Sequence, residues 1–310
     1  MAGVLVYSDK DSLALELLTA AREMATALNV EVKTLSINNG PQAHSLAEAG
    51  AKAYKADNSE LILADTACIA AALKQAMEEL ALDTVLLSSN RRGKELAGRL
   101  AQMSEAGCIT DVLEIKIEGR QVNCQRNALG GATVATVNIS SARKVIAIMP
   151  RAFSPAVSEP GGSVNDIALK ASGSGIKVVE VRGQGSDSAD IESANVLVAV
   201  GQGLNSKEDL AMVEALAKKL GGEIACSKPV ATDKKWLSED RVIGLSGKKC
   251  KPELAILLGI SGQVQFTVGI RDARTIVAVN TDENAYINQM ADYILNSDLH
   301  EVVAELNKTL

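Results

Sequence analysis

Short apolar, β-rich runs alternate with helical stretches along most of the chain. In the first half the runs 3–8, 31–37 and 84–89 have the composition of strands, and the stretches 12–28 and 66–81 read as helices, the first with apolar residues at helical spacing. Parallel strands need a crossover connection, which is usually a helix, so this rhythm favours a parallel sheet with helices on both faces. The chain is therefore predicted to be an α/β protein.

The second half repeats the same pattern. Its predicted strands are 195–200, 223–226, 253–258 and 275–280, and its predicted helices are 206–220 and 301–310. The first of these helices carries an apolar stripe, and Ser206 with Asp209 makes a capping pair at its start. The stripe consists of Leu210, Val213, Leu216 and Leu220. We expect a second α/β unit with a doubly wound sheet.

A change of composition separates the two halves. The segment 150–175 holds three of the six prolines together with many glycines and serines, and is predicted to be irregular. A strand is predicted at 176–182, and the Gly/Ser/Asp-rich segment 183–194 is the best linker candidate. With 310 residues, about two domains are expected. We place them at 1–189 and 190–310, each a mainly parallel sheet with flanking helices.

Composition removes several classes of function. A net charge of −6 and 2% aromatic residues disfavour nucleic acid and anionic lipid as partners. His44 and His300 are the only histidines, which disfavours catalytic groups built on an imidazole. The five cysteines contain no CxxC pair, so neither a metal site nor a disulfide framework is expected. No signal peptide or membrane-spanning run is visible, and a cytoplasmic protein without membrane insertion is predicted.

The strand exits of the second half contain unusually many small and amide residues. The stretch LAILLGISGQVQF, residues 254–266, passes from a buried strand directly to Ser261, Gly262 and Gln263. The other exits are Gly201-Gln202-Gly203, Ser227-Lys228 and Asn280-Thr281-Asp282. Ligands of open α/β sheets bind beyond the carboxyl ends of strands, and glycine lets backbone N–H groups approach a phosphate. Together the four exits predict a nucleotide site.

These residues resemble a known family. The blocks Gly259–Phe266, Ile276–Asp282 and Ala291–Tyr293 are similar to the FAD-binding segment of electron transfer flavoprotein α subunits, including the Fix-type bacterial proteins. Further blocks follow the family order: VGQGL (200–204), CSKPVA (226–231), IGLSGK (243–248) and PEL (252–254). The similarity is strong over about 195–310. It is looser in the first half, where RRGKELAGRLA (91–101) carries it.

The resemblance implies a function and a site. It implies an FAD-binding second domain, a nucleotide-hydrolase-like first domain that binds partners, and a heterodimer with a β subunit. Electrons would pass between an acyl-CoA dehydrogenase-like partner and another redox protein, so the chain would be a carrier rather than an enzyme with its own small-molecule substrate. The implied cofactor-binding residues are Gly201, Gln202, Gly203, Ser227, Lys228, Leu245, Ser246, Gly247, Gly259, Ser261, Gly262, Gln263, Gln265, Phe266, Asn280, Asp282 and Asp292.

Four positions depart from the family pattern. Gln202 and Lys228 stand where the family has arginines, and Leu245 stands where it has glutamine. Phe266 replaces a histidine that, by the resemblance, donates a hydrogen bond to the pyrimidine carbonyl of the flavin. Negative charge collects there on reduction, so loss of that donor is expected to lower the one-electron potential or to weaken FAD retention.

The sequence leaves alternatives open. The chain is either an electron-transferring α subunit or a non-redox nucleotide-binding or assembly subunit that has lost flavin function. An NAD-linked oxidoreductase would need a full GxGxxG motif and a catalytic donor, and neither is found. Trp236 either covers the flavin or anchors its own loop, and Cys226 is expected to be a small buried thiol. Whether the β subunit carries AMP or a second FAD stays undecided.

Overall fold

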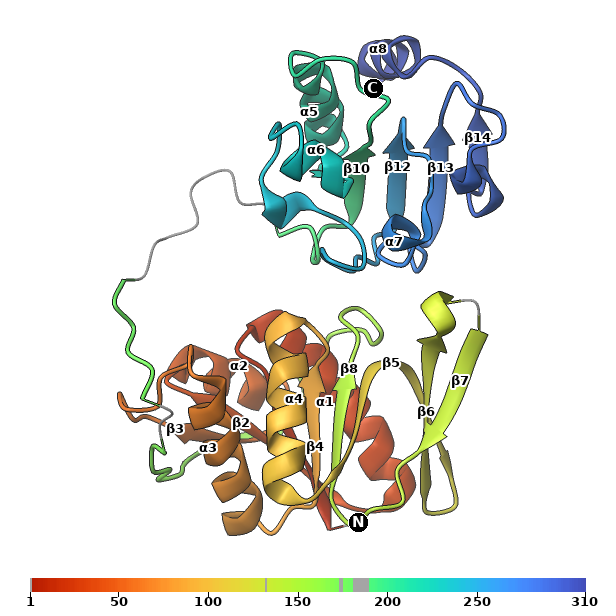
Figure 1. Ribbon diagram of the computed structural model, residues 1–310. Coiled ribbons are helices and arrows are strands. Elements are labelled where there is room, and N and C mark those ends of the chain that lie inside the picture. The colour runs from red at the N-terminus through yellow and green to blue at the C-terminus, as the bar shows by residue number, and fades with distance from the viewer. Residues whose placement is uncertain (1, 132, 173–174, 181–189) are drawn as a thin grey trace. The chain divides into compact units, whose positions relative to one another are not determined.

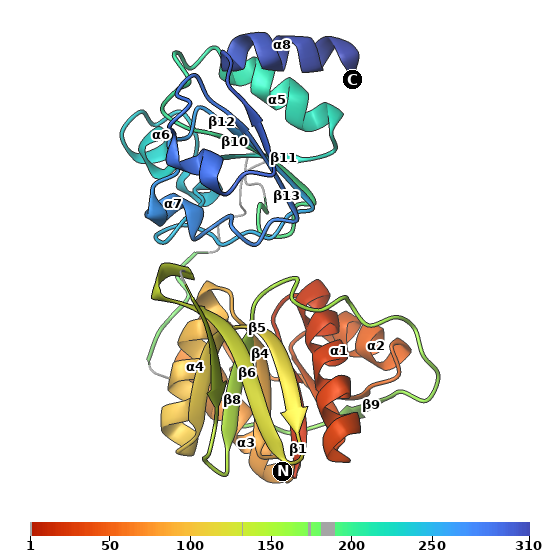
Figure 2. The same cartoon turned by 90° about the vertical axis from the view of Figure 1, so that its right-hand side faces the viewer.

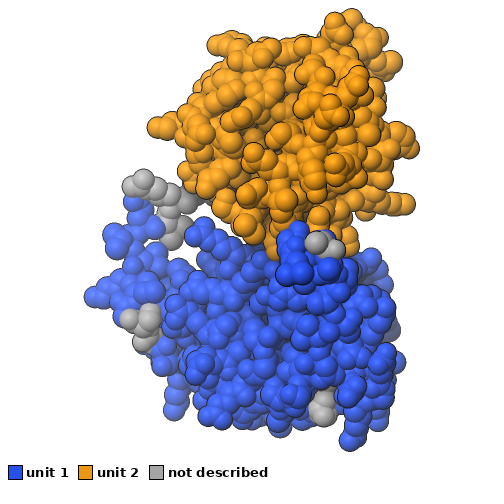
Figure 3. Space-filling view, turned by 45° about the vertical axis from the view of Figure 1, so that its right-hand side comes forward, with its two compact units in different colours: residues 1–181 blue, residues 182–310 orange. Residues whose placement is uncertain are grey.

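The computed structural model describes residues 2–131, 133–172, 175–180 and 190–310. The chain divides into two compact units, residues 1–181 and 182–310, which Figure 3 shows in separate colours. The predicted linker at 183–194 falls largely outside the described residues, and so does residue 189 at the predicted domain boundary. Each unit is described by itself.

Unit 1 is built on one large sheet. The described strands form a nine-stranded sheet with the order β7-β6-β5-β8-β4-β1-β2-β3-β9 (Figure 1). Most neighbours are parallel, whereas β6 pairs antiparallel with both β5 and β7. The mainly parallel architecture is confirmed, and the antiparallel extension was not predicted. The strands are β1 Gly3–Tyr7, β2 Glu31–Ile37, β3 Lys52–Ala56, β4 Thr84–Ser88, β5 Gly107–Glu118, β6 Gln121–Ala128, β7 Thr133–Asn138, β8 Lys144–Ile148 and β9 Ser163–Asp166.

Helices cover both faces of this sheet, as Figure 2 shows. They are α1 Asp11–Leu28, α2 Gly40–Glu48, α3 Thr66–Glu79 and α4 Arg91–Ser104, with a 3₁₀ turn at Leu129–Gly131. Successive residues of a strand face opposite sides, so Leu5 packs with α3 and α4 while Val4 and Val6 pack with α1. The two apolar layers explain why β1 is buried along its whole length.

Two predictions for the segment 150–182 are wrong in part. The predicted irregular stretch contains β9, which pairs with β3. This strand is too short to be found by a search for long strand patterns. The strand predicted at 176–182 does not form in residues 176–180, and residues 181 and 182 lie outside the described ranges. Among the described residues no strand pairs with this run, and Val179 in it is 96% exposed. Apolar composition alone does not make a strand where no sheet edge receives it.

Unit 2 is a smaller doubly wound α/β unit. Its five-stranded sheet has the order β11-β10-β12-β13-β14, and all pairs are parallel. One face carries α5, α6 and α8, and the other carries α7, which confirms the predicted doubly wound fold. The strands are β10 Val196–Val200, β11 Glu223–Cys226, β12 Leu254–Leu258, β13 Thr275–Val279 and β14 Tyr293–Leu295. The helices are α5 Leu210–Lys219, α6 Lys228–Thr232, α7 Val264–Thr267 and α8 Leu299–Thr309, with 3₁₀ turns at Glu239–Arg241 and Tyr286–Gln289.

Helix α5 begins later than predicted. It starts at Leu210 instead of Ser206, because residues 207–209 form a bend and a turn. Across that turn the backbone N–H of Ser206 donates to the carboxylate of Asp209 at 2.9 Å. The predicted pair is therefore a real contact, with the carboxylate closing the entry to the helix.

Candidate functional site

A cleft of about 700 Å³ lies at the carboxyl edge of the unit 2 sheet. Strands β10, β11, β12 and β13 are parallel and in register, so the loops that follow them meet at one edge. Strand β10 lies between β11 and β12. The chain therefore passes from β10 to β11 on one side and then crosses to β12 on the other side of β10. Such a reversal opens a crevice beyond the strands, where ligands of this fold class bind.

The cleft brings the predicted residues together with two exceptions. The predicted residues that line it are Gly201, Gln202, Gly203, Ser227, Lys228, Leu245, Ser246, Gly259, Ser261, Gly262, Gln263, Gln265, Phe266, Asn280 and Asp282. Gly247 and Asp292 do not line it. Residues from at least five separate segments thus converge on one surface, a convergence that depends on the sheet order.

The two exceptions have structural roles. Asp292 accepts a hydrogen bond from the backbone N–H of Ile276 at 2.8 Å, at the amino end of β13. That is the opposite end of the strand from the cleft, so the structure does not place Asp292 beside the other residues. Gly247 donates to the carbonyl of Gly244 at 3.1 Å and closes a turn. The turn presents Leu245 and Ser246 to the cleft.

We call the loops that follow β10, β11, β12 and β13 the first, second, third and fourth loops. The glycines of the first and third loops allow their backbones to touch. The N–H of Gly203 donates to the carbonyl oxygen of Gly259 at 3.0 Å. A Cβ atom on Gly201 would lie 2.2 Å from the same oxygen, and one on Gly203 would lie 2.7 Å from the Cα of Gly259. Any larger residue at Gly201 or Gly203 would push the two loops apart.

The third loop leaves backbone donors unused. Within the described part of the chain, no hydrogen bond takes up the N–H groups of Ser261, Gly262 or Gln263, and the same is true of Gln202. Gly262 has φ of +86°, which only glycine adopts without strain. Successive free N–H groups form a concave donor surface suited to phosphate oxygens.

The fourth loop is shaped by its own side chains. Asn280 donates from its amide to the carbonyl of Ile260 at 3.0 Å and accepts from the N–H of Asp282 at 3.1 Å. Asp282 in turn accepts from the N–H of Asn284 at 2.9 Å. Asn280 therefore fixes the third and fourth loops against each other, and Asp282 lines the cleft beside it.

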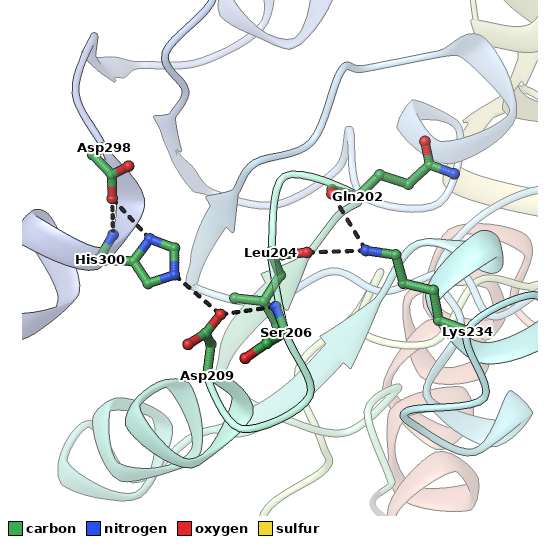
Figure 4. Close-up of polar contacts among 7 residues, drawn as sticks. All are labelled: Gln202, Leu204, Ser206, Asp209, Lys234, Asp298 and His300. Carbon is green, nitrogen blue, oxygen red and sulfur yellow. Dashed lines mark hydrogen bonds and ion pairs between the residues drawn. The ribbon is translucent and has the colours of Figure 1, made fainter.

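A lysine that does not line the cleft donates hydrogen bonds to the backbone of the first loop. Figure 4 shows Lys234, whose Nζ donates to the carbonyls of Leu204 at 2.9 Å and Gln202 at 3.5 Å. The same Nζ lies 4.1 Å from the ring centroid of Trp236. The N–H of Trp236 donates to the carbonyl of Val230. Trp236 is therefore an anchor for its loop and not part of the cleft lining.

The structure adds residues that lie outside the predicted cofactor-binding set. Pro229, Thr232, Asp233, Ile243, Ile260 and Ala285 also line the cleft. Thr232 and Asp233 follow the exit of β11 by one helical turn. Their sequence spacing from Ser227 was the signal that could have indicated their place in the cleft. The adjacent Cys226 is buried, and burial raises the pKa of its thiol to about 12. Its thiol stays protonated at neutral pH, in agreement with the expected buried role.

Comparison with known proteins bears on both units. The family model described as "Electron transfer flavoprotein domain" matches residues 5–181, more than half of the chain, and "Electron transfer flavoprotein FAD-binding domain" matches residues 190–271. The chain belongs to the electron transfer flavoprotein family. It is similar to Protein FixB of Escherichia coli (strain SMS-3-5 / SECEC), with 32% identity over 99% of this chain and 97% of the relative. Protein FixB of Shigella dysenteriae serotype 1 and of Escherichia coli O157:H7 match over the same shares at 31% identity.

These matches give the chain its role as the α subunit of an electron transfer flavoprotein, with FAD as its cofactor. Alpha subunits of this family pair with a β subunit. The alternative of a non-redox assembly subunit is not favoured. In the part of the chain that the structure describes, no helix has the length and hydropathy needed to cross a bilayer.

The cleft fits FAD on the observations above. A volume of about 700 Å³ lies within the usual range for cofactor sites, and unused N–H groups lie beside glycine loops, as a diphosphate requires. The lining has one lysine, Lys228, against the two carboxylates Asp233 and Asp282. The positive charge of the lining is therefore low for a site that receives a diphosphate. Lys234, which donates to the first loop from outside the lining, is thus a more important source of positive charge.

Replacing Lys234 by glutamine is expected to weaken FAD binding about three- to tenfold, because the first loop loses a charged hydrogen-bond donor. The measurement is titration of the deflavinated α/β complex with FAD, followed by flavin fluorescence. The exposed neighbour Lys235, changed to glutamine, is the control and should bind like the wild type. Equal affinities for the Lys234 variant and the control would contradict a role for this contact.

Proposed function

We propose that FAD lies in the unit 2 cleft with its diphosphate against the first and third loops. The backbone N–H groups of Gln202 and of Ser261–Gln263 donate to the phosphates. Lys228 and Ser246 face the flavin ring, with Phe266 as an apolar wall beside it. The observation that carries this assignment is the meeting of two glycine loops, with unused donors, at the switch point of a parallel sheet.

The chemistry of the lining supports a carrier. When bound, the flavin supplies the uptake and release of electrons. The lining holds no histidine, and its only carboxylates are Asp233 and Asp282, so no acid–base pair for work on a small substrate is assembled. The side chains bind and orient the cofactor, and Phe266, which is 7% exposed, keeps water from its wall of the cleft.

The partners and the location follow as proposals. The chain would form a heterodimer with its β subunit and exchange electrons with an acyl-CoA dehydrogenase-like partner, as the family resemblance implies. We place it in the cytoplasm, where its five free cysteines suit a reducing compartment. A dehydrogenase reduced by its acyl-CoA substrate should bleach the flavin of the α/β complex when the two are mixed. If only a dehydrogenase of another substrate class bleached this flavin, that dehydrogenase would be the partner instead.

Co-expression with the β subunit tests the function directly. The purified complex should be yellow and should release FAD, with one FAD held by each α chain. Release from Gly201→Ala complexes reports which flavin belongs to the α chain, because that residue lies in the unit 2 cleft. A second, unaffected flavin would belong to the β subunit. A colourless, well-folded complex that does not take up added FAD would contradict the proposal.

A further inference from the structure

A histidine lies between two carboxylates behind the first loop. His300, in the first turn of α8, has its Nε2 atom 3.2 Å from a carboxylate oxygen of Asp209 and its Nδ1 atom 2.8 Å from one of Asp298 (Figure 4). The backbone N–H of His300 also donates to Asp298, the N-terminal cap of α8. The ring therefore joins the starts of α5 and α8.

This geometry suits the charged ring. A neutral imidazole has one N–H donor, so one of the two carboxylates would face a ring lone pair. The imidazolium donates to both. Two hydrogen bonds raise the pKa of His300 above its usual 6.5, the one to Asp209 having the larger effect and the one to Asp298 the smaller. These two carboxylates are the titratable groups that face the ring from α5 and α8.

The cluster is continuous with the cleft. Asp209 accepts the N–H of Ser206, and both residues lie in the segment 201–209 that begins with the first loop. Next to His300, the side chain of Leu299 reaches to 3.1 Å from the Cβ position of Gly259. Helix α8 thus contacts the third loop through Leu299 and the segment behind the first loop through His300.

We propose that protonated His300 is a positioning residue for FAD: it ties α8 to the segment 201–209 and holds the first loop in its binding conformation. Fixing a loop before binding removes part of the ordering cost of binding. FAD therefore binds more tightly while the ring is charged. By reciprocity, FAD binding makes the ring harder to deprotonate. The inference rests on the proposed FAD site.

The sign of the pH dependence follows from the raised pKa. At low pH the His300 ring is charged whether or not the first loop is held in its binding conformation. Its hydrogen bonds to Asp209 and Asp298 then contribute in full. As the pH rises through the raised pKa of His300, the proton is lost and the contribution disappears. Because the His300 side chain is 30% exposed, solvent screens the pair and the effect is moderate, about fivefold in affinity.

The test measures FAD affinity of the deflavinated α/β complex between about pH 6 and about pH 9. Wild type should lose about fivefold in affinity across the titration of His300. The H300Q variant should bind weakly at every pH, without this step. His44, the only other histidine, gives the control variant H44Q, which should behave like the wild type.

A second measurement needs no change at His300. With labelled histidine in the α chain alone, two ring signals are expected, and H44Q removes one of them. The remaining signal should titrate at higher pH with FAD bound than without it. An identical midpoint in both states, or the same pH dependence in the wild type and H300Q, would overturn the positioning role. A wild-type complex that never binds FAD would overturn the proposed function instead.

Discussion

Alanine in place of Gly201 is expected to weaken FAD binding by the α chain. The new Cβ would lie 2.2 Å from the carbonyl oxygen of Gly259 and 2.8 Å from the Cα of Ile260. Both contacts are with backbone, so no side-chain rotation relieves them, and overpacking of this kind costs about 1–3 kcal/mol. Relief requires the exits of β10 and β12 to separate, which moves the unused N–H groups apart. FAD affinity should fall about five- to 150-fold, since each step of about 1.4 kcal/mol corresponds to a factor of ten.

Flavin content and the thermal unfolding of the complex are the two measurements for Gly201→Ala. Gly98 in α4 is the matched control, because a Cβ at that position meets nothing within 4 Å. Its change to alanine adds helix propensity and should leave flavin content unchanged. If Gly201→Ala retained FAD with wild-type affinity, contact between the first and third loops would not be needed for binding.

The buried strands of unit 2 were predictable because parallel strands covered on both faces are continuous apolar runs. Leu254–Leu258 is such a run, and it forms the centre of the sheet as β12. Its exit was informative for a related reason: glycine and small polar residues directly after a buried strand face the edge where ligands bind. Local chemistry therefore predicted most of the cleft lining.

Edges of sheets were not predictable in the same way. Tyr293–Leu295 forms β14 although all three residues are exposed, and its strand geometry comes from pairing with β13. Residues 176–180 have the more strand-like composition, yet no strand receives them and they stay irregular. Whether an edge segment becomes a strand depends on a partner elsewhere in the chain, which composition does not encode.

The aspartates show the same limit within the site. Asp292 was predicted near the cofactor from its place in a motif, but its carboxylate caps the amino end of β13. Asp298 and Asp209 attracted no functional prediction, yet they bracket His300 directly behind the first loop. These roles depend on helix α8 packing against α5, a contact between segments about 90 residues apart in the chain.

Introducing histidine at Phe266 is expected to raise the one-electron potential of the bound flavin. Phe266 stands where the resembled family places the donor to the pyrimidine carbonyl, and it lines the cleft. A hydrogen bond to a group that gains negative charge stabilises the reduced form by about 1.5–3 kcal/mol, and about 1.4 kcal/mol equals 59 mV for one electron, so the rise should be roughly 60–130 mV. Spectroelectrochemical titration of the α/β complex measures it.

The cost of that change lies in the apolar cluster behind the cleft. Phe266 is buried among Ile243, Ile260, Ile270 and Ile287, so histidine gives up packing there unless its ring reaches the flavin. The only other phenylalanine, Phe153 of unit 1, provides the control: Phe153→His should leave the potential unchanged. A Phe266→His complex that binds FAD with an unaltered potential would show that this side chain does not reach the flavin carbonyl. A raised potential would mean that the phenylalanine at this position lowers the potential of the bound flavin.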